Sequence, residues 1–210
     1  MSKEKIVSFY LDHLLDQGKP PVSVYKLCKE TGISEADFYR QYSSLRDIER
    51  QYARDLVQKT IEAVSGDEEY SQYSVREKLL AFYFTFFEQA LSFRSYLQVR
   101  FANVQPGREP GFLKDFKRTF LDFAQELIQQ GYEEKSVVQR PLVSGRFKDI
   151  LYAQFLLLIR YYVEDDSQQF QDTDAYIEKT VKLFFELAGT TPIDTAFDLA
   201  RFFIQNRRHA

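Results

Sequence analysis

The chain has 210 residues, a formal net charge of −3, 44% hydrophobic residues and 28% charged residues. This length accommodates one large or two small domains with a sizeable core, and the composition is that of a soluble globular protein. The balance of charge excludes a polycation, so any nucleic-acid surface has to be local.

The first predicted helix covers residues 3–17, where Ile6, Phe9, Tyr10, His13 and Leu14 follow the spacing of one helical face. Gly18 and the prolines after it end this helix. No apolar run of a signal peptide opens the chain, and the longest apolar stretch, 155–159, is too short to cross a bilayer. We therefore expect a cytoplasmic protein without a membrane partner.

Residues 22–48 contain two short helices around a tight turn. Val24, Leu27 and Cys28 give the first its apolar face, and Gly32 ends it because glycine readily adopts the left-handed conformation. Ser34 is placed to cap the second helix, with Asp37 three residues on. The pattern predicts a helix-turn-helix, whose second helix enters a DNA major groove.

Several residues of this segment resemble the signature of the tetracycline-repressor (TetR) family: Gly32-Ile33-Ser34, Phe38-Tyr39, Tyr42, Ser44 and Ile48. The resemblance covers about the first fifty residues. It implies a helix-turn-helix head over residues 1–45, followed by a helical ligand-binding and dimerisation body over 46–210. It also implies binding of double-stranded operator DNA through Lys26, Ser34, Glu35, Tyr39, Arg40 and Arg46.

Three positions depart from the family pattern. Glu35 and Asp37 stand where the family usually has a small or basic residue and a phosphate-contacting threonine, and Leu45 replaces a lysine. Each change removes a favourable backbone contact or adds repulsion against phosphate. Residues 1–50 also carry equal numbers of basic and acidic side chains, whereas a DNA-binding head is usually more basic.

The remainder of the chain shows helical periodicity only, which predicts an all-α fold of about ten helices. The helices expected after the head cover residues 44–65, 74–91, 93–104, 112–131, 143–163 and 172–188, and a last one runs from Thr191 to about Asn206. Ser43 and Ser44 can cap the first of these. In TetR-like proteins that helix links the head to the body.

Aromatic residues make up 16% of the chain. Either they fill the core in place of leucine, or they line a pocket for a small apolar or aromatic effector. The candidate pocket residues are Phe82, Phe86, Arg100, Phe101, Phe116, Phe120 and Tyr152. Arg94, Arg100 and Arg160 could anchor an anionic group if they point inward.

The helix at 143–163 is too apolar for the surface of a monomer, and TetR-like proteins dimerise through two long helices near the C-terminus. The resemblance therefore implies a homodimer. Its expected interface residues are Ile150, Leu151, Phe155, Leu158, Ile159, Tyr162 and Phe184.

No catalytic motif appears, and two histidines with one cysteine do not make a metal cluster of the usual spacing. We expect no enzyme, no cofactor and no metal. The first hypothesis is a TetR-type transcriptional regulator, a repressor, which a small apolar or aromatic ligand releases from its operator. The alternative is a TetR-fold protein that has lost DNA binding and binds a lipid or small molecule.

Overall fold

In the computed structural model, residues 2–140 and 144–189 are described, and their regular secondary structure is entirely helical. The α-helices are α1 (Ser2–Gln17), α2 (Val24–Thr31), α3 (Glu35–Gln41), α4 (Leu45–Ser65), α5 (Val75–Ala90), α6 (Arg94–Phe101), α7 (Lys114–Glu133), α8 (Phe147–Glu164) and α9 (Gln171–Ala188). Short 3-10 helices are η1 (Tyr70–Gln72), η2 (Leu91–Phe93), η3 (Gly111–Leu113), η4 (Ser144–Arg146) and η5 (Gln168–Phe170). The predicted all-α class is confirmed; the helix expected after Thr191 lies outside the described residues.

Serine caps set where four of these helices begin. The side-chain oxygens of Ser23, Ser34, Ser44 and Ser74 each accept a hydrogen bond from the backbone N–H three residues further on. At α5 the cap is reciprocal, because the Glu77 carboxylate accepts from the Ser74 backbone N–H at 2.8 Å. Such caps each contribute about 1 kcal/mol to helix stability. The predicted caps at Ser34 and Ser44 are confirmed.

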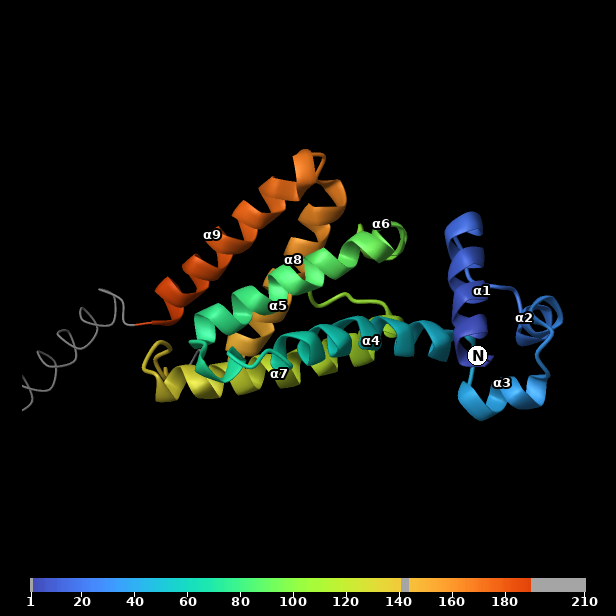
Figure 1. Cartoon of the computed structure of the whole chain (residues 1–210), viewed down its shortest axis with the longest axis horizontal. Helices are drawn as coiled ribbons and strands as arrows, with labels where there is room; N and C mark the ends of the chain where they lie inside the picture. Colours follow the sequence, from blue (N-terminus) through green and yellow to red (C-terminus); the bar gives the residue numbers. More distant parts are fainter. Residues whose placement is uncertain (1, 141–143, 190–210) are drawn as a thin grey trace, which may run out of the picture.

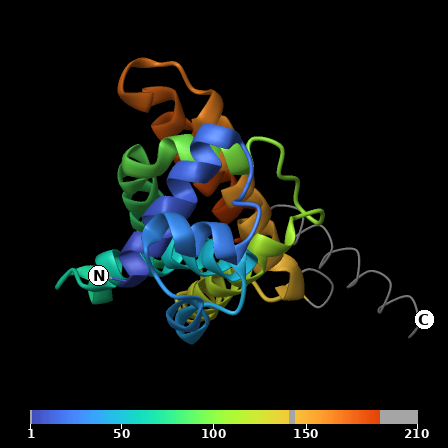
Figure 2. The same cartoon turned by 90° about the vertical axis from the view of Figure 1, so that its right-hand side faces the viewer.

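The helices form two groups joined by α4 (Figure 1). We call α1–α3 the head and α5–α9 the body. The head lies at one end of the molecule, and α4 runs from it along α7 and α5. In the body, α8 packs against α6, α7 and α9. Seen from the head end, α1–α3 lie in front of the body (Figure 2).

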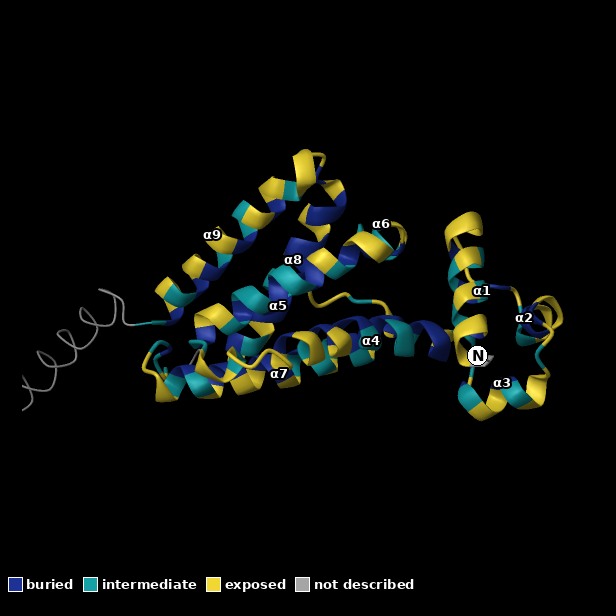
Figure 3. Cartoon of the chain, in the orientation of Figure 1, coloured by how far each residue is buried: buried dark blue, intermediate teal, exposed yellow. Residues whose placement is uncertain are grey.

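Burial follows this arrangement (Figure 3). The sides of α5, α7 and α8 that face one another are buried, while much of α2 and α3 is exposed. One continuous apolar cluster extends from α1 through α4 into the body. The head is therefore attached to the body by packed side chains as well as by the chain itself. No helix within the described ranges is long and apolar enough to span a bilayer.

Candidate nucleic-acid interface and its connection to the body

The turn between α2 and α3 has the geometry that the sequence predicts. Gly32 has φ +69°, a left-handed conformation in which other residues are strained. The N–H of Ile33 donates to the Cys28 carbonyl at 3.1 Å, and Thr31 Oγ1 donates to the Leu27 carbonyl at 2.8 Å. These bonds satisfy the end of α2 and bring α3 in directly after it.

One side of α3 anchors it and the other faces solvent. Phe38 is fully buried in the head, and Tyr42 just beyond the helix is buried beside it. Tyr39 packs its ring edge against Phe38 yet keeps 55% of its surface exposed. The remaining exposed residues of the helix are Glu35, Ala36 and Arg40. This outward face is the surface that a helix-turn-helix presents to the major groove.

The carboxylate of Asp37 holds two of the predicted DNA contacts together. Ser34 Oγ donates to Asp37 Oδ2 at 2.6 Å while accepting from the Asp37 backbone N–H at 3.1 Å. Arg40 Nη1 lies 2.6 Å from Asp37 Oδ1, although the Arg40 side chain is 75% exposed. Asp37 thus accepts the hydrogen bond of the Ser34 hydroxyl and neutralises the charge of Arg40. These are two of the groups that are expected to contact DNA.

Replacing Asp37 with asparagine should strengthen binding to DNA of any sequence. The change frees the Arg40 charge for a phosphate, so we expect roughly fivefold tighter binding at low salt and a log–log salt slope steeper by about one. Fluorescence anisotropy over a salt series measures both. Asp16→Asn removes an exposed charge next to the last residue of α1, away from α3, and should change neither quantity. A slope that does not steepen in D37N would contradict a phosphate role for Arg40.

The other predicted DNA residues lie on the same end of the molecule. Lys26 on α2 and Arg46 at the start of α4 are exposed, and so is Lys29. Sequence reasoning missed Tyr25, which is 65% exposed on α2 between these lysines and the apolar face. The signal was available, because Tyr25 falls outside the Val24, Leu27, Cys28 spacing. An exposed aromatic ring next to basic residues suits a surface that meets nucleic acid.

A buried ion pair connects the head to the body through α4. Glu49 of α4 is 3% exposed, and its two carboxylate oxygens receive Arg100 Nε at 2.5 Å and Arg100 Nη2 at 3.1 Å. The hydroxyls of Tyr10 in α1 and Tyr96 in α6 also donate to this carboxylate, at 3.2 and 3.5 Å. One side chain of α4 is therefore bonded to the head and to α6 of the body at once.

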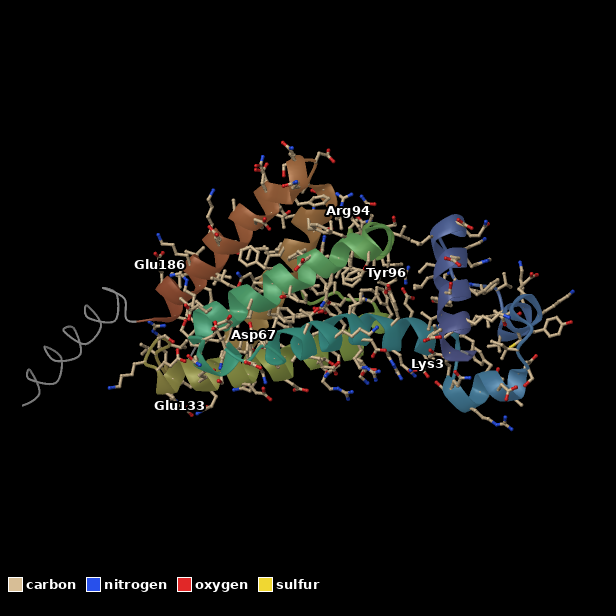
Figure 4. The ribbon with its side chains drawn as sticks, viewed as in Figure 1. Lys3, Asp67, Arg94, Tyr96, Glu133 and Glu186 are labelled. Atoms are coloured by element: carbon tan, nitrogen blue, oxygen red, sulfur yellow. The ribbon has the colours of Figure 1, made fainter. Side chains whose placement is uncertain are left out.

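The tyrosines of this cluster are held in their donor form. Burial and the neighbouring Glu49 raise the pKa of Tyr10 and of Tyr96, so both hydroxyls remain protonated. Figure 4 places Tyr96 at the end of the body nearest the head. Glu49 escaped the sequence analysis even though it occupies the apolar stripe of α4, four residues after Leu45. A charged residue on a buried stripe signals a paired partner.

Arg94 fixes the other end of α6. Its Nη2 donates to the carbonyls of Tyr162, Val163 and Asp165, at 3.3, 3.3 and 3.1 Å, and its guanidinium lies 5.0 Å from the Phe170 ring centroid. It thereby satisfies the free carbonyls at the end of α8. Arg94 and Arg100 were both expected as anchors for a ligand anion. The structure corrects this expectation, because each guanidinium is already engaged within the protein.

The predicted pocket residues come together, but as neighbouring rings in a packed core. Phe155 is fully buried, and the ring centroids of Phe82, Phe86, Phe116 and Phe120 lie 5.4, 4.7, 5.4 and 4.8 Å from its own. Such spacings are those of directly contacting rings. Of the two alternatives left by the sequence, these contacts favour aromatic side chains that fill the space between α5, α7 and α8.

Among the described residues, Tyr152 brings an unpaired hydroxyl to this aromatic core, whereas the hydroxyl of Tyr83 donates to the Leu151 carbonyl at 3.4 Å. Tyr152 is 2% exposed, it lies beside Phe116 and Phe120, and its hydroxyl has no hydrogen-bond partner among the described residues. Burial raises the pKa of Tyr152, and Glu109 adds to the effect. A buried hydroxyl without a partner costs free energy, so it marks a place where a ligand acceptor would be stabilised.

Most of the predicted dimer-interface residues lie inside the protomer. Between 0 and 7% of each remains exposed at Leu151, Phe155, Leu158, Ile159, Tyr162 and Phe184, because α8 is packed on several sides by α6, α7 and α9. These six residues therefore have almost no surface to offer a partner. Of the predicted interface residues only Ile150, which is 45% exposed, remains available for a contact with a second protomer. The large apolar residues of α8 and α9 that remain exposed are Ile150, Leu157, Tyr161, Leu183 and Leu187.

These features define a class: all-helical proteins that carry a helix-turn-helix head on a larger helical body. The tetracyclin repressor-like C-terminal domain family matches residues 78–203, more than half of the chain. The chain therefore belongs to the TetR family. No curated protein matches it by sequence.

Solved structures extend the similarity over the head. A putative TetR-family regulator from Shewanella sp. PV-4 has 18% identity and a TM-score of 0.65, covering 90% of this chain and 99% of its own. One from Syntrophomonas wolfei has 17% identity and a TM-score of 0.67, covering 89 and 94%. The fatty acid degradation regulator FadR from Bacillus halodurans has 14% identity and a TM-score of 0.64, covering 87 and 97%. The shared feature is the fold of TetR-type transcription regulators.

Proposed function

We propose that this protein is a cytoplasmic transcriptional repressor, not an enzyme, that binds operator DNA as a homodimer and leaves it when a small apolar or aromatic ligand enters the body. Residues 1–45 form the DNA-binding domain and residues 46–210 the ligand-binding and dimerisation domain. The observation that carries the proposal is the outward face of α3, where Tyr39 and Arg40 are exposed on a helix fixed by Phe38.

Two such heads would read half-sites in successive major grooves, about 34–36 Å apart. Basic side chains that flank α3, namely Lys26, Lys29 and Arg46, are exposed and suit contacts with the phosphates. A ligand that binds better to a second arrangement of the body would shift the population away from the DNA-binding spacing. The Glu49–Arg100 pair gives such a change a direct route from α6 to α4 and α1.

A titration of the purified chain with fluorescent DNA from its own upstream region, at two salt concentrations, tests the proposal. We expect specific binding that weakens steeply with salt, as phosphate contacts require. The double variant Tyr39→Ala, Arg40→Ala removes the outward face but keeps Phe38, and should abolish specific binding. Equal, weak binding by both proteins would contradict a reading role for α3.

The second candidate function is binding of a lipid or small molecule by a protein that has lost DNA binding. The hydrogen bonds and the ion pair of Asp37 favour this alternative. The Asp37 carboxylate occupies Ser34 and Arg40 in the free protein, and Glu35 adds another negative charge. A protein of this kind would bind its lipid or small molecule without contacting an operator. No binding at low salt in the same titration, without added ligand, would decide in its favour.

The Tyr152 hydroxyl has no hydrogen-bond partner among the described residues, which supports the proposal that the ligand is apolar and carries one hydrogen-bond acceptor. Organic extraction of the purified protein, followed by mass spectrometry, would identify a co-purified molecule. Tyr152→Phe keeps the ring but removes the donor, so it should retain less of that molecule while folding normally. Identical retention by the wild type and Y152F would place the ligand elsewhere.

The homodimer is proposed to form through the exposed apolar residues of α8 and α9. Leu157 and Tyr161 are one turn apart on α8, and Leu183 and Leu187 are one turn apart on α9, each 39–60% exposed. Exposed apolar side chains on two helices that pack side by side suit a protein interface. This surface replaces the buried residues that the sequence suggested.

Leu157→Arg combined with Leu183→Arg should convert the dimer into a monomer, because each protomer would bury two unpaired charges at the interface. Light scattering at micromolar concentration should then show half the wild-type mass. Leu91→Arg introduces the same charge at a 58% exposed leucine beyond the end of α5, and its mass should stay that of the wild type. A monomeric wild type would contradict the homodimer itself.

A further inference from the structure

The two acids on α3 differ in what their carboxylates already bind. Asp37 accepts hydrogen bonds from Ser34 and Arg40 within the same helix. Glu35, the first residue of α3, is exposed and makes no hydrogen bond or ion pair with any residue that the structure describes. Only Glu35 therefore brings a free carboxylate to the outward face of α3.

Its position on the helix determines what that carboxylate meets. In a helix-turn-helix bound to DNA, the N-terminal residues of the second helix contact the base edges. A carboxylate is an acceptor only, so it needs a donor on those edges. In the major groove guanine offers N7 and O6, and thymine offers O4, all of them acceptors that repel it. Cytosine offers the N4 amino group as a donor. Adenine also offers an amino group, N6, but the acceptor N7 lies beside it.

We propose that Glu35 is a specificity-determining residue that reads a cytosine in each half-site of the operator. This inference rests on the proposed DNA-binding function and gives it a defined sequence preference. The same carboxylate opposes binding where the base it faces is not cytosine, since it then meets acceptors and phosphates, and at adenine a donor with the acceptor N7 beside it. An acid at the start of α3 thus lowers affinity for unrelated DNA more than it lowers affinity for the operator.

The test is selection of binding sites from random duplex DNA by the purified full chain, with the wild type, Glu35→Gln and Glu30→Gln in parallel. Glutamine pairs with adenine through N6 and N7, so E35Q should change one cytosine of each half-site to adenine and leave the other positions as they are. Glu30 is an exposed acid on α2, and E30Q should keep the cytosine.

Fluorescence anisotropy with duplexes that differ only at the base pair facing residue 35 then measures the preference for cytosine. The wild type should favour cytosine over the other bases by about 5- to 100-fold, and E35Q should lose that preference. If E35Q selects the wild-type sequence and merely binds all DNA more tightly, Glu35 only repels phosphate and the inference is overturned while the proposed function stands. If the wild type selects no sequence at all, the proposed function fails and the inference fails with it.

Discussion

Phe155→Ala should destabilise the protein by about 3–5 kcal/mol, because it removes the ring at the centre of a packed aromatic core. Phe155 has no exposed surface, and its ring lies within 5.7 Å, centroid to centroid, of Phe82, Tyr83, Phe86, Phe116 and Phe120. The neighbouring rings are large and stiff, so they collapse poorly into the space left behind. Urea denaturation of the purified protein, followed by circular dichroism, measures the change in the free energy of unfolding.

Leu91→Ala, which removes a 58% exposed leucine beyond the end of α5 and outside the proposed dimer interface, is the matched control. L91A should leave the packed core unchanged and alter the free energy of unfolding little. A loss below about 1 kcal/mol in F155A would contradict a filled core and indicate a cavity already present between the helices.

Arg100→Met should destabilise the protein by about 3 kcal/mol or more, because it leaves the Glu49 carboxylate buried without its cation. The two tyrosine hydroxyls that remain, Tyr10 and Tyr96, supply hydrogen bonds but no charge. The Arg100 side chain is 25% exposed and the Glu49 side chain 4%, so the larger penalty falls on the glutamate left behind. Chemical denaturation at pH 7 checks the size of the loss.

A double-mutant cycle separates the pair from its surroundings. Glu49→Gln removes the buried charge, so the double variant E49Q/R100M should be more stable than R100M alone. The coupling also predicts a functional effect, since Glu49 joins α1, α4 and α6. R100M should weaken the effect of a bound ligand on DNA affinity at a temperature where the variant stays folded. Additive losses in the cycle would contradict a direct pairing of these two residues.

The helices and the turn were predictable from sequence because their signals are local. Ser34 and Ser44 cap the helices that they were expected to cap, and Gly32 has the left-handed conformation that the turn requires. The TetR resemblance was drawn from the first fifty residues or so, whereas the family match covers 78–203, and the two agree. Periodicity also placed the long helices of the body to within a few residues.

The partners of individual side chains were not predictable, because they depend on how distant helices pack. An apolar residue such as Ile159 has the same sequence signal whether it faces its own core or a second copy, and here it is fully buried in the protomer. Arg100 shows no sign in the sequence that Glu49, 51 positions away, will bind it. The pairing of Asp37 with Arg40 is different, because the two residues lie three positions apart on one helix and their spacing alone predicts the contact.

A footprint of the purified chain on its own upstream DNA tests the central claim most directly. Two heads joined in one dimer should protect two half-sites on the same face of the duplex, with centres one helical turn or a multiple of it apart. Tyr39→Ala combined with Arg40→Ala should remove both protected regions together. Protection of a single half-site would contradict a dimeric regulator that reads DNA through α3. Uniform protection of the whole fragment that only rises with protein concentration would contradict it as well.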